Sequence, residues 1–441
     1  MKKTALRLMA GMMAVLLLTG CGSPAAQPAP DIEPTAHEAQ LPEIIVYADA
    51  MAETSDPTQL YNALAEYYTA IDALHNGARE LMPDMAAFTA RTAAPIFTGK
   101  SENTVFSPSS LYLAMAMLAD ATDGDTRSQI AAVLDAPQYA EAANALWRMM
   151  YENGATVALP ANALWSGVKW PVKQALADQL ASSYYADSFT VPMGTKTADE
   201  LMQSWLNEHT GGQLTQQAQS VQSDADTALA LMSTLYFRGF WLNEFMESST
   251  APAPFTQADG SSRTADFMHA ETSGSWHQGK QYVSSSLYFT DGGSMLLVLP
   301  DEGILPEDLL SDADAVQDML TATPEQYTYI HWSVPKFDVS SQLDLAEPLQ
   351  ALGVTHAFDA ALADFSPTTE ETAVSLSSAQ QAARVSIDER GCTAAAFTVM
   401  MGVGAGMPND YILDMKLDRP FLFVLFGSSQ VPLFVGTVYT P

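Results

Sequence analysis

Residues 391–407 are the part of this 441-residue chain that most restricts its fold, because they contain no charged residue although 16% of the chain is charged. The run is rich in alanine, glycine and methionine and is followed by Pro408. It is longer than an ordinary strand, and its glycines make it a poor membrane-spanning helix. Left exposed, it would pair with other strand edges, so the fold must provide a place for it.

The composition is that of a folded, strongly acidic protein. Hydrophobic residues make up 48% of the chain, and 51 Asp and Glu outnumber 19 Lys and Arg, which gives a net charge of −32. This charge argues against nucleic-acid binding, and the hydrophobic content argues against disorder for most of the chain. The seven histidines include no pair at metal-ligand spacing, and Cys21 and Cys392 indicate no disulfide framework. We expect no metal and no cofactor.

The N-terminus is typical of an export signal. Basic residues precede a short apolar run at 8–18, which predicts a secretory signal over residues 1–20 rather than a spanning helix. The signal ends in Leu-Thr-Gly followed by Cys21, which resembles the lipobox of bacterial lipoproteins. The resemblance implies a lipidated Cys21 that anchors the protein to the bacterial membrane outside the cytoplasm. The alternative is an ordinary cleaved signal with an incidental cysteine.

The remainder divides into a tether, a helix and one large domain. Residues 21–55 are predicted to be a flexible tether, because they begin with a Pro-, Ala- and Gln-rich stretch. An Asp-Pro start and an Asn-Gly stop predict a helix over 57–76, within an additional N-terminal segment 56–81. Its apolar stripe is expected to pack on the main body. Residues 82–441 contain no linker and no repeat, which indicates a single domain.

Within this domain, helices come first and strands dominate later. Helical spacing occurs at 110–119, 139–151 and 198–209, and short buried-strand patterns occur at 231–237, 294–299 and 421–426. The regular alternation of a doubly wound fold is missing from the pattern, so we predict an α+β class.

A series of motifs follows one order along residues 82–441. The motifs lie at 103–110, 122–126, 205–214, 235–241, 294–300, 334–337, 352–354, 363–366, 419–423 and 433–436. Both the motifs and their order resemble the serpin family. The resemblance implies a serpin fold, with helices followed by mostly antiparallel β-sheets and an exposed reactive-centre loop.

The same resemblance assigns two polar regions to the large sheet. Trp241 would mark the breach at the top of the sheet. The shutter beneath the sheet would contain Asn103, Ser107, Ser110, Ser233 and Gln381. Ser233 replaces the usual asparagine and Gln381 replaces a common histidine, and both can still form hydrogen bonds.

Residues 387–398 resemble the hinge of inhibitory serpins, which leads from a strand into the reactive loop. The hinge residues are Glu389, Gly391, Cys392, Thr393, Ala394, Ala395, Ala396 and Thr398. Their small side chains would let the loop enter a preformed sheet, with even-numbered residues from Cys392 to Met400 facing inward and Phe397 outward. At roughly 0.5–1.5 kcal/mol per ladder hydrogen bond, about fifteen bonds would release on the order of 10–20 kcal/mol.

The resemblance therefore implies a suicide inhibitor that is not an enzyme and has no catalytic residue of its own. A serine or cysteine protease would cleave the loop, form an acyl-enzyme and be carried along as the loop inserts. We expect the inhibitor to be a monomer.

The reactive bond follows from the spacing of the hinge. Counting about seventeen residues from Glu389, as the family spaces its hinge, gives Ala405–Gly406. Rivals are Met401, Val403 and Met407, and counting back from the strand after the loop gives a position near Asn409. The loop has no Lys or Arg, which disfavours trypsin-like targets and favours elastase-like or subtilisin-like proteases.

Two other functions remain open at this point. A non-inhibitory serpin could keep the fold for binding, although such members usually lose the small hinge residues. A serine hydrolase is a remote alternative, because Ser166 and Lys169 match Ser-x-x-Lys and Lys196-Thr197-Ala198 is close to Lys-Thr-Gly.

Overall fold

The structure is a computed structural model that describes residues 34–42, 56–154, 156–290, 292–323, 326–371, 374–392 and 412–441. The helices are α2 (Pro57–His75), α3 (Met85–Phe97), α4 (Pro108–Asp120), α5 (Gly124–Leu134), α6 (Tyr139–Met150), α7 (Gln174–Ser183), α8 (Lys196–His209), α9 (Thr215–Gln219), α10 (Pro306–Leu310), α11 (Ala313–Thr321) and α12 (Ala346–Ala351). The strands are β1 (Thr35–His37), β2 (Thr104–Phe106), β3 (Glu152–Asn153), β4 (Val157–Gly167), β5 (Ala186–Val191), β6 (Leu229–Phe240), β7 (Ala251–Thr256), β8 (Ser262–Gln278), β9 (Tyr282–Tyr288), β10 (Ser294–Pro300), β11 (Gln326–Pro335), β12 (Phe337–Asp344), β13 (Leu376–Ile387), β14 (Gly391–Cys392), β15 (Ile412–Lys416), β16 (Phe421–Phe426) and β17 (Pro432–Val438).

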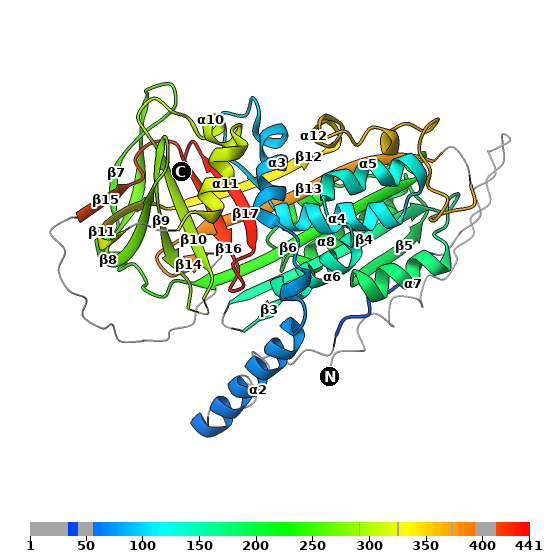
Figure 1. Cartoon of the computed structure of the whole chain (residues 1–441), viewed down its shortest axis with the longest axis horizontal. Coiled ribbons are helices and arrows are strands. Elements are labelled where there is room, and N and C mark those ends of the chain that lie inside the picture. Colours follow the sequence, from blue (N-terminus) through cyan, green and yellow to red (C-terminus); the bar gives the residue numbers. More distant parts are fainter. Residues whose placement is uncertain are drawn as a thin grey trace, which may run out of the picture. The chain divides into compact units, whose positions relative to one another are not determined.

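Two sheets form the frame (Figure 1). The eight-stranded sheet has the order β1-β5-β4-β6-β14-β13-β12, with β3 paired to β4. The nine-stranded sheet has the order β15-β11-β8-β9-β10-β16-β17-β2, with β7 paired to β8. Most neighbouring strands are antiparallel, and β4–β5, β6–β13 and β11–β15 pair in parallel. The predicted α+β class is confirmed.

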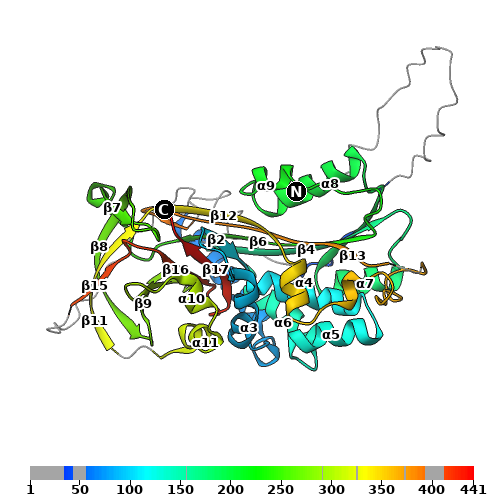
Figure 2. The ribbon, with the colours of Figure 1, turned by 90° about the horizontal axis from the view of Figure 1, so that it is seen from above.

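Helices cover both faces of the eight-stranded sheet. Figure 2 shows α8 and α9 on one face and α4, α5 and α6 on the other. The main hydrophobic core lies on the α4 side and includes Leu111, Leu235 and Phe237, whereas a smaller core under α8 includes Trp165 and Trp205. The strands β4 and β6 are therefore buried on both faces, which accounts for their apolar sequences.

Helix α2 begins and ends as the sequence predicts. Asp56 accepts hydrogen bonds from the backbone N–H groups of Thr58 and Gln59, and Gly77 follows the C-cap with a φ of 72°. Tyr67 and Ile71 are buried, whereas Tyr61 is 72% exposed, so only part of the apolar stripe packs on the body. No helix among the described residues is long and apolar enough to cross a bilayer.

Part of the predicted tether is an ordered strand. Thr35–His37 forms β1, which pairs antiparallel with β5, and the Ala39 N–H donates to Asp187 Oδ1 at 2.9 Å. The prediction of a flexible tether is therefore wrong for residues 34–42, because the edge strand β5 offers unpaired backbone groups to an extended chain. The predicted signal 1–20 and Cys21 lie outside the described residues.

Candidate functional site

A short strand enters the eight-stranded sheet between β6 and β13. In β14, Gly391 pairs with Phe240 of β6, and Cys392 pairs with Gly239 of β6 and with Ile387 of β13. At their other ends β6 and β13 pair with each other directly, through Leu229 to Leu231 and Leu376 to Ala379. We call the boundary between β6 and β13 the seam. At one end of the seam β6 and β13 pair directly, and at the other end β14 lies between them.

The close approach of backbones at β14 requires a glycine. A Cβ atom on Gly391 would lie 2.1 Å from the Gly239 carbonyl oxygen and 2.9 Å from Phe240 Cα. The turn before β14 is held by Asp388, whose Oδ1 accepts from the N–H groups of Arg390 and Gly391 at 2.9 and 3.2 Å. The next residue, Cys392, is 1% exposed. Thr393 to Thr398, the rest of the hinge, lie outside the described residues.

The predicted breach residue Trp241 holds this turn against β6. Its indole N–H donates to the Asp388 carbonyl at 2.9 Å, and its backbone N–H donates to the Arg390 carbonyl at 2.8 Å. The ring is 2% exposed and stacks on Phe289 with centroids 4.8 Å apart. The turn before β14 is therefore fixed to the end of β6.

Glu389 connects the turn to the neighbouring strands by an ion pair. Lys336 Nζ lies 3.0 Å from Glu389 Oε2, and the Thr250 hydroxyl donates to Oε1 at 2.8 Å. Burial alone would raise the pKa of the Glu389 carboxyl, but the hydrogen bonds from Lys336, its own backbone and Thr250 outweigh it and hold that pKa below its ordinary value. Sequence reasoning gave Lys336 and Thr250 no role, although Lys336 lies within one of the family-like motifs.

The polar residues beneath the sheet form two separate groups. Gln381 holds the backbone of Ser107, accepting from its N–H at 2.7 Å and donating to its carbonyl at 3.0 Å. Ser233 donates to the Ser110 carbonyl at 3.1 Å and forms a 2.8 Å hydrogen bond with Asn162 Oδ1. No hydrogen bond joins Ser233 to Gln381 among the described residues. The replacements in this family-like cluster therefore keep hydrogen bonds, but to separate partners.

Asn103, which was assigned to the same cluster, lies elsewhere. Its side chain donates to the Thr440 carbonyl at 2.6 Å and accepts from the N–H groups of Tyr439 and Thr440 at 2.7 and 2.9 Å. It therefore fastens the C-terminus to the segment before β2. Asn162, which sequence reasoning missed, takes the place beside Ser233.

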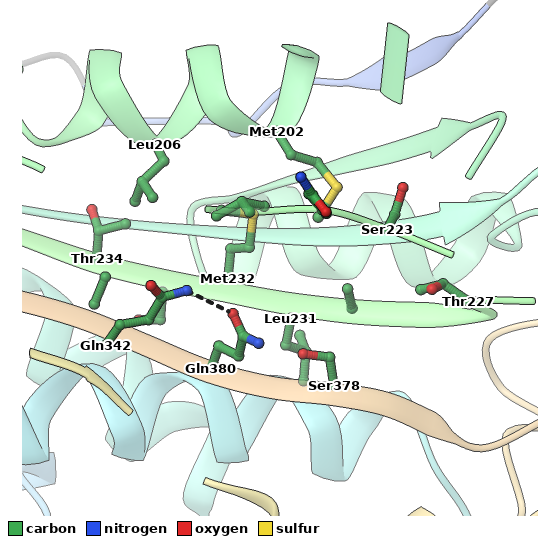
Figure 3. A pocket seen from close by; sticks show the side chains of 15 residues that line it. Met202, Leu206, Ser223, Thr227, Leu231, Met232, Thr234, Gln342, Ser378 and Gln380 are labelled. Carbon is green, nitrogen blue, oxygen red and sulfur yellow. Dashed lines mark hydrogen bonds between the residues drawn. The ribbon is translucent and has the colours of Figure 1, made fainter. Parts of the chain in front are cut away.

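Cavities line the seam on both faces of the sheet. One of about 70 Å³ lies under α8, between Met202 and Leu206 of the helix and Met232 and Thr234 of β6 (Figure 3). Another of about 30 Å³ lies on the α4 face and is lined by residues that include Ser233. Both cavities are partly open, and both border β6 and β13 along the seam.

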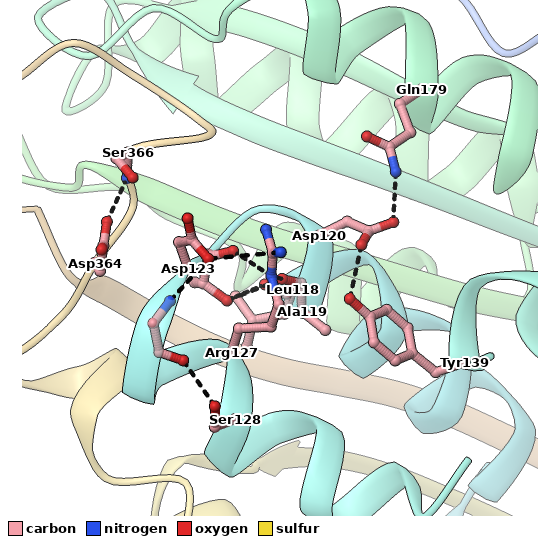
Figure 4. Close-up of polar contacts among 12 residues, drawn as sticks. Leu118, Ala119, Asp120, Asp123, Arg127, Ser128, Tyr139, Gln179, Asp364 and Ser366 are labelled. Carbon is pink, nitrogen blue, oxygen red and sulfur yellow. Dashed lines mark hydrogen bonds and ion pairs between the residues drawn. The ribbon is translucent and has the colours of Figure 1, made fainter. Parts of the chain in front are cut away.

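A polar network fixes α4, the helix beneath the seam (Figure 4). The Arg127 Nε–H donates to the carbonyls of Ala119 and Thr122 at 3.0 and 2.7 Å, which caps the C-terminus of α4. Asp120 accepts from the Tyr139 hydroxyl at 2.8 Å and from Gln179 at 2.6 Å. Burial, together with this hydrogen bond, raises the pKa of Tyr139 to about 12.

The residues of the serine hydrolase hypothesis are not brought together. Ser166 is buried, and its hydroxyl lies 2.9 Å from the hydroxyl of Thr190. Lys169 is 64% exposed and faces Asp226, and Lys196 pairs with Glu200 on the surface of α8. No group of acidic, histidine or cysteine side chains in the described part of the chain could hold a metal ion.

The reactive-bond candidates Met401, Val403, Ala405, Gly406 and Met407 lie outside the described residues. The described chain fixes both ends of the segment that carries them, at Cys392 in β14 and at Ile412 in β15. The two ends lie in different sheets. The segment therefore connects the seam of one sheet to the edge strand of the other.

Comparisons with known sequences agree on one family. A family model described as Serpin (serine protease inhibitor) matches residues 85–441. Serpin-Z1C of Triticum aestivum is 30% identical over 371 residues, which cover 77% of this chain and 90% of that protein. Alpha-1-antiproteinase S of Cavia porcellus is 27% identical over 391 residues, which cover 83% of this chain and 92% of that protein.

Solved structures show the same fold. The native-state structure of the thermophilic serpin tengpin matches with a TM-score of 0.72 and 24% identity, over 81% of this chain and 94% of that one. A thyroxine-binding globulin complex with thyroxine matches with a TM-score of 0.70 and 21% identity, over 81% of this chain and 99% of that one. Proteins of this fold differ in function, so the fold alone does not establish whether this chain is an inhibitor.

Proposed function

The chain belongs to the serpin family, and on that basis we propose that it inhibits serine proteases as a suicide substrate. The target cleaves the segment between β14 and β15 and forms an acyl-enzyme with it. The released segment then enters the seam behind β14 and carries the protease with it before water can attack the ester. The observation that carries this proposal is β14 itself, which already occupies the open end of the seam.

The register of β14 supports this path for the rest of the segment. Because Cys392 pairs with Gly239, continuing the same register places Thr398 opposite Ser233 and Phe397 opposite Thr234. Thr398 would then face the cavity on the α4 side, where the Ser110 hydroxyl is buried without a hydrogen-bond partner among the described residues. Phe397 would face the cavity under α8, which Thr234 lines. Each cavity would thus receive a side chain.

The target class follows from the absence of basic residues in the cleaved segment. A trypsin-like pocket needs a cation, whereas small-pocket elastase-like and subtilisin-like proteases accept Ala405, our favoured residue before the cleaved bond. Cysteine proteases form acyl-enzymes by the same chemistry and are a second target class.

The test uses a soluble variant that begins after Cys21, mixed separately with pancreatic elastase, chymotrypsin and trypsin. Denaturing electrophoresis reports a covalent complex, and mass spectrometry identifies the released peptide. We expect a heat-stable complex with elastase and a peptide that starts at Gly406. Cleavage without a complex for every protease would contradict inhibition and favour a binding role on the same fold.

We also propose that Cys21 is lipidated and holds the inhibitor at the outer side of a bacterial membrane. The support is the lipobox-like sequence, since two or more acyl chains give stable anchoring. Full-length protein and a Cys21→Ser variant, expressed in bacteria fed a clickable palmitate analogue, test this. Labelling of the full-length protein alone is expected, and equal labelling of both would contradict the proposal.

A further inference from the structure

A line of paired residues connects the seam to β1, the strand formed by the N-terminal segment. Leu229, at the start of β6, pairs with Leu376 of β13 and with Ser166 of β4. Ser166 pairs with Thr190 of β5, and Thr190 pairs with Thr35 of β1. The line crosses the sheet where β6 and β13 pair directly, and we call this end of the sheet the closed end. Figure 1 shows β5 and β14 at opposite ends of the sheet.

The direction of β1 brings the predicted tether to the closed end. β4 is antiparallel to β6, β5 is parallel to β4, and β1 is antiparallel to β5. Because β6 starts at the closed end, β1 also starts there, with Thr35. The chain that leads from Cys21 to β1 therefore joins the body at the closed end.

Few contacts hold β1 on the body. Its three residues are exposed or half-buried. Beyond its pairing with β5, the segment is held by the hydrogen bond of the Ala39 N–H and by a 3.0 Å hydrogen bond from the Gln40 N–H to the Ala181 carbonyl. His37 Nε2 also lies 3.3 Å from Asp178 Oδ1, and both of these side chains are partly exposed. Segments with few buried apolar contacts open at the lowest free energy, so β1 can leave β5 while the body stays folded.

The proposed mechanism brings the trapped protease to the same end. Continuing the register of β14 places Gly402 opposite Leu229, and our favoured reactive residue Ala405 follows within at most about 11 Å. Four strand spacings of about 4.8 Å separate the inserted strand from β1, a distance of about 19 Å. A protease of about 250 residues has a radius of gyration of about 18 Å, so its surface extends farther than this distance. The protease bound to Ala405 therefore reaches β1.

The length of the chain before β1 makes this overlap important. Fourteen positions separate Cys21 from Thr35, so the chain between them spans at most about 50 Å. A protease about 45 Å across would have to fit into this space if Cys21 is held at a membrane. With β1 released, 35 positions separate Cys21 from Asp56 at the start of α2, and the chain spans up to about 120 Å.

We propose that β1 is a latch that keeps the tether short before the reaction and that the trapped protease opens. This inference rests on the proposed function and on the lipidation of Cys21, and it adds a consequence of inhibition: the complex gains a longer tether than the free inhibitor has. Insertion by itself leaves the latch closed, because β6, β4 and β5 lie between the seam and β1.

Hydrogen exchange tests the opening of the latch. The soluble form that begins after Cys21 is compared in three states: intact, nicked in its loop by a protease that does not remain bound, and in the covalent complex with pancreatic elastase. Mass spectrometry follows the backbone amides of residues 34–42, with those of β16 as an internal control. We expect residues 34–42 to exchange at least about tenfold faster in the complex than in the other two states, and β16 to exchange equally in all three.

A disulfide tests whether the latch has to open. His37 of β1 and Ser188 of β5 are direct cross-strand partners, at a separation that a disulfide accepts. Ser188 is 4% exposed, and its hydroxyl has no hydrogen-bond partner among the described residues, so a cysteine there breaks no hydrogen bond. In oxidised His37→Cys/Ser188→Cys the protease cannot displace β1, and the stoichiometry of inhibition should rise at least about threefold. The matched control is the same variant after reduction, which should inhibit as the wild type does.

Three results would overturn the inference. Slow exchange of residues 34–42 in the covalent complex, together with equal stoichiometry in the oxidised and reduced variant, would show that β1 stays in place, and it would leave the proposed function intact. Fast exchange in the nicked protein as well would show that insertion, rather than the protease, opens β1. Failure of the wild type to form a covalent complex would instead overturn the proposed function and this inference with it.

Discussion

The two sheets of this protein differ in how their neighbouring strands pair. In the nine-stranded sheet, β16 and β17 are buried along their whole length, and Phe423 of β16 stacks on Phe337 of β12, in the eight-stranded sheet, with ring centroids 5.2 Å apart. In the eight-stranded sheet, cavities lie on both sides of the seam, and β6 and β13 pair directly at one end only. In one sheet β16 and β17 pair along their whole length, whereas the other is interrupted at the seam, where the proposed mechanism adds one more strand. We therefore expect substitutions in β16 to act on stability and substitutions at the seam to act on insertion.

The largest expected effect comes from a charge placed in the seam. In a Cys392→Arg variant the guanidinium would replace a side chain that is 1% exposed, so β14 should leave the seam and insertion should slow. The protease then completes hydrolysis, and the yield of covalent complex should fall at least about tenfold, since each 1.4 kcal/mol on the insertion barrier is a factor of ten. The stoichiometry of inhibition measures this, with Cys392→Ser as the control. Equal stoichiometry for both variants would contradict the role of β14.

A cavity in the nine-stranded sheet should act on stability alone. Phe423→Ala removes a fully buried ring and should lower the free energy of unfolding by about 3–5 kcal/mol. Urea unfolding followed by tryptophan fluorescence measures the loss, and the stoichiometry of inhibition at 25 °C should stay at the wild-type value. A large rise in stoichiometry would show that the two sheets are not separate in function.

Loss of the Glu389 ion pair should destabilise the hinge in a pH-dependent way. Because the folded-state pKa of Glu389 is lowered, its contribution is present above the unfolded value of about 4.3 and disappears as pH falls through the folded pKa. Glu389→Gln should therefore cost about 1–3 kcal/mol at pH 7 and progressively less below about pH 4. Urea unfolding of both proteins between pH 7 and 3 checks this. A constant difference over that range would contradict the assignment.

Filling the smaller cavity should have the smallest effect on the free energy of unfolding, and it should stabilise the protein, whereas the preceding substitutions destabilise it. Ala114 of α4 lines the cavity beneath the seam, and Ala114→Val should stabilise the uncleaved protein by about 0.5–1 kcal/mol. The methyl groups that this substitution adds should hinder the incoming strand and raise the stoichiometry of inhibition slightly. Differential scanning calorimetry and titration against elastase measure both values. A destabilised protein with unchanged stoichiometry would show that the cavity is not part of the insertion path.

The sequence predicts the fold well because its signals are local. Apolar periodicity and capping residues locate α2, α4 and α8, and short apolar runs locate β6 and β16. These features depend on neighbouring residues, so they can be read without knowing the tertiary contacts. The entry of the small residues after Gly391 into the sheet remains a prediction, and it comes from the resemblance to the serpin hinge rather than from local periodicity.

Contacts between distant segments could not be predicted. Lys336 and Thr250 approach Glu389 only because β12, β7 and the turn before β14 meet at the top of the seam. Asn103 belongs to a shutter-like motif by sequence, yet folding places it against the C-terminus. The strand β1 lies in a stretch whose composition resembles a linker, and only the unpaired edge of β5 gives it an ordered place.

The most direct test of the account is the stability of the protein after its loop has been cut. A protease that cleaves the loop of the soluble form without remaining bound gives a nicked protein, whose thermal unfolding is compared with that of the intact form. Insertion of the segment behind β14 would add ladder hydrogen bonds worth on the order of 10–20 kcal/mol and should raise the melting temperature by at least about 20 °C. An unchanged or lowered melting temperature in the nicked protein would contradict the claim that the seam is built to receive another strand.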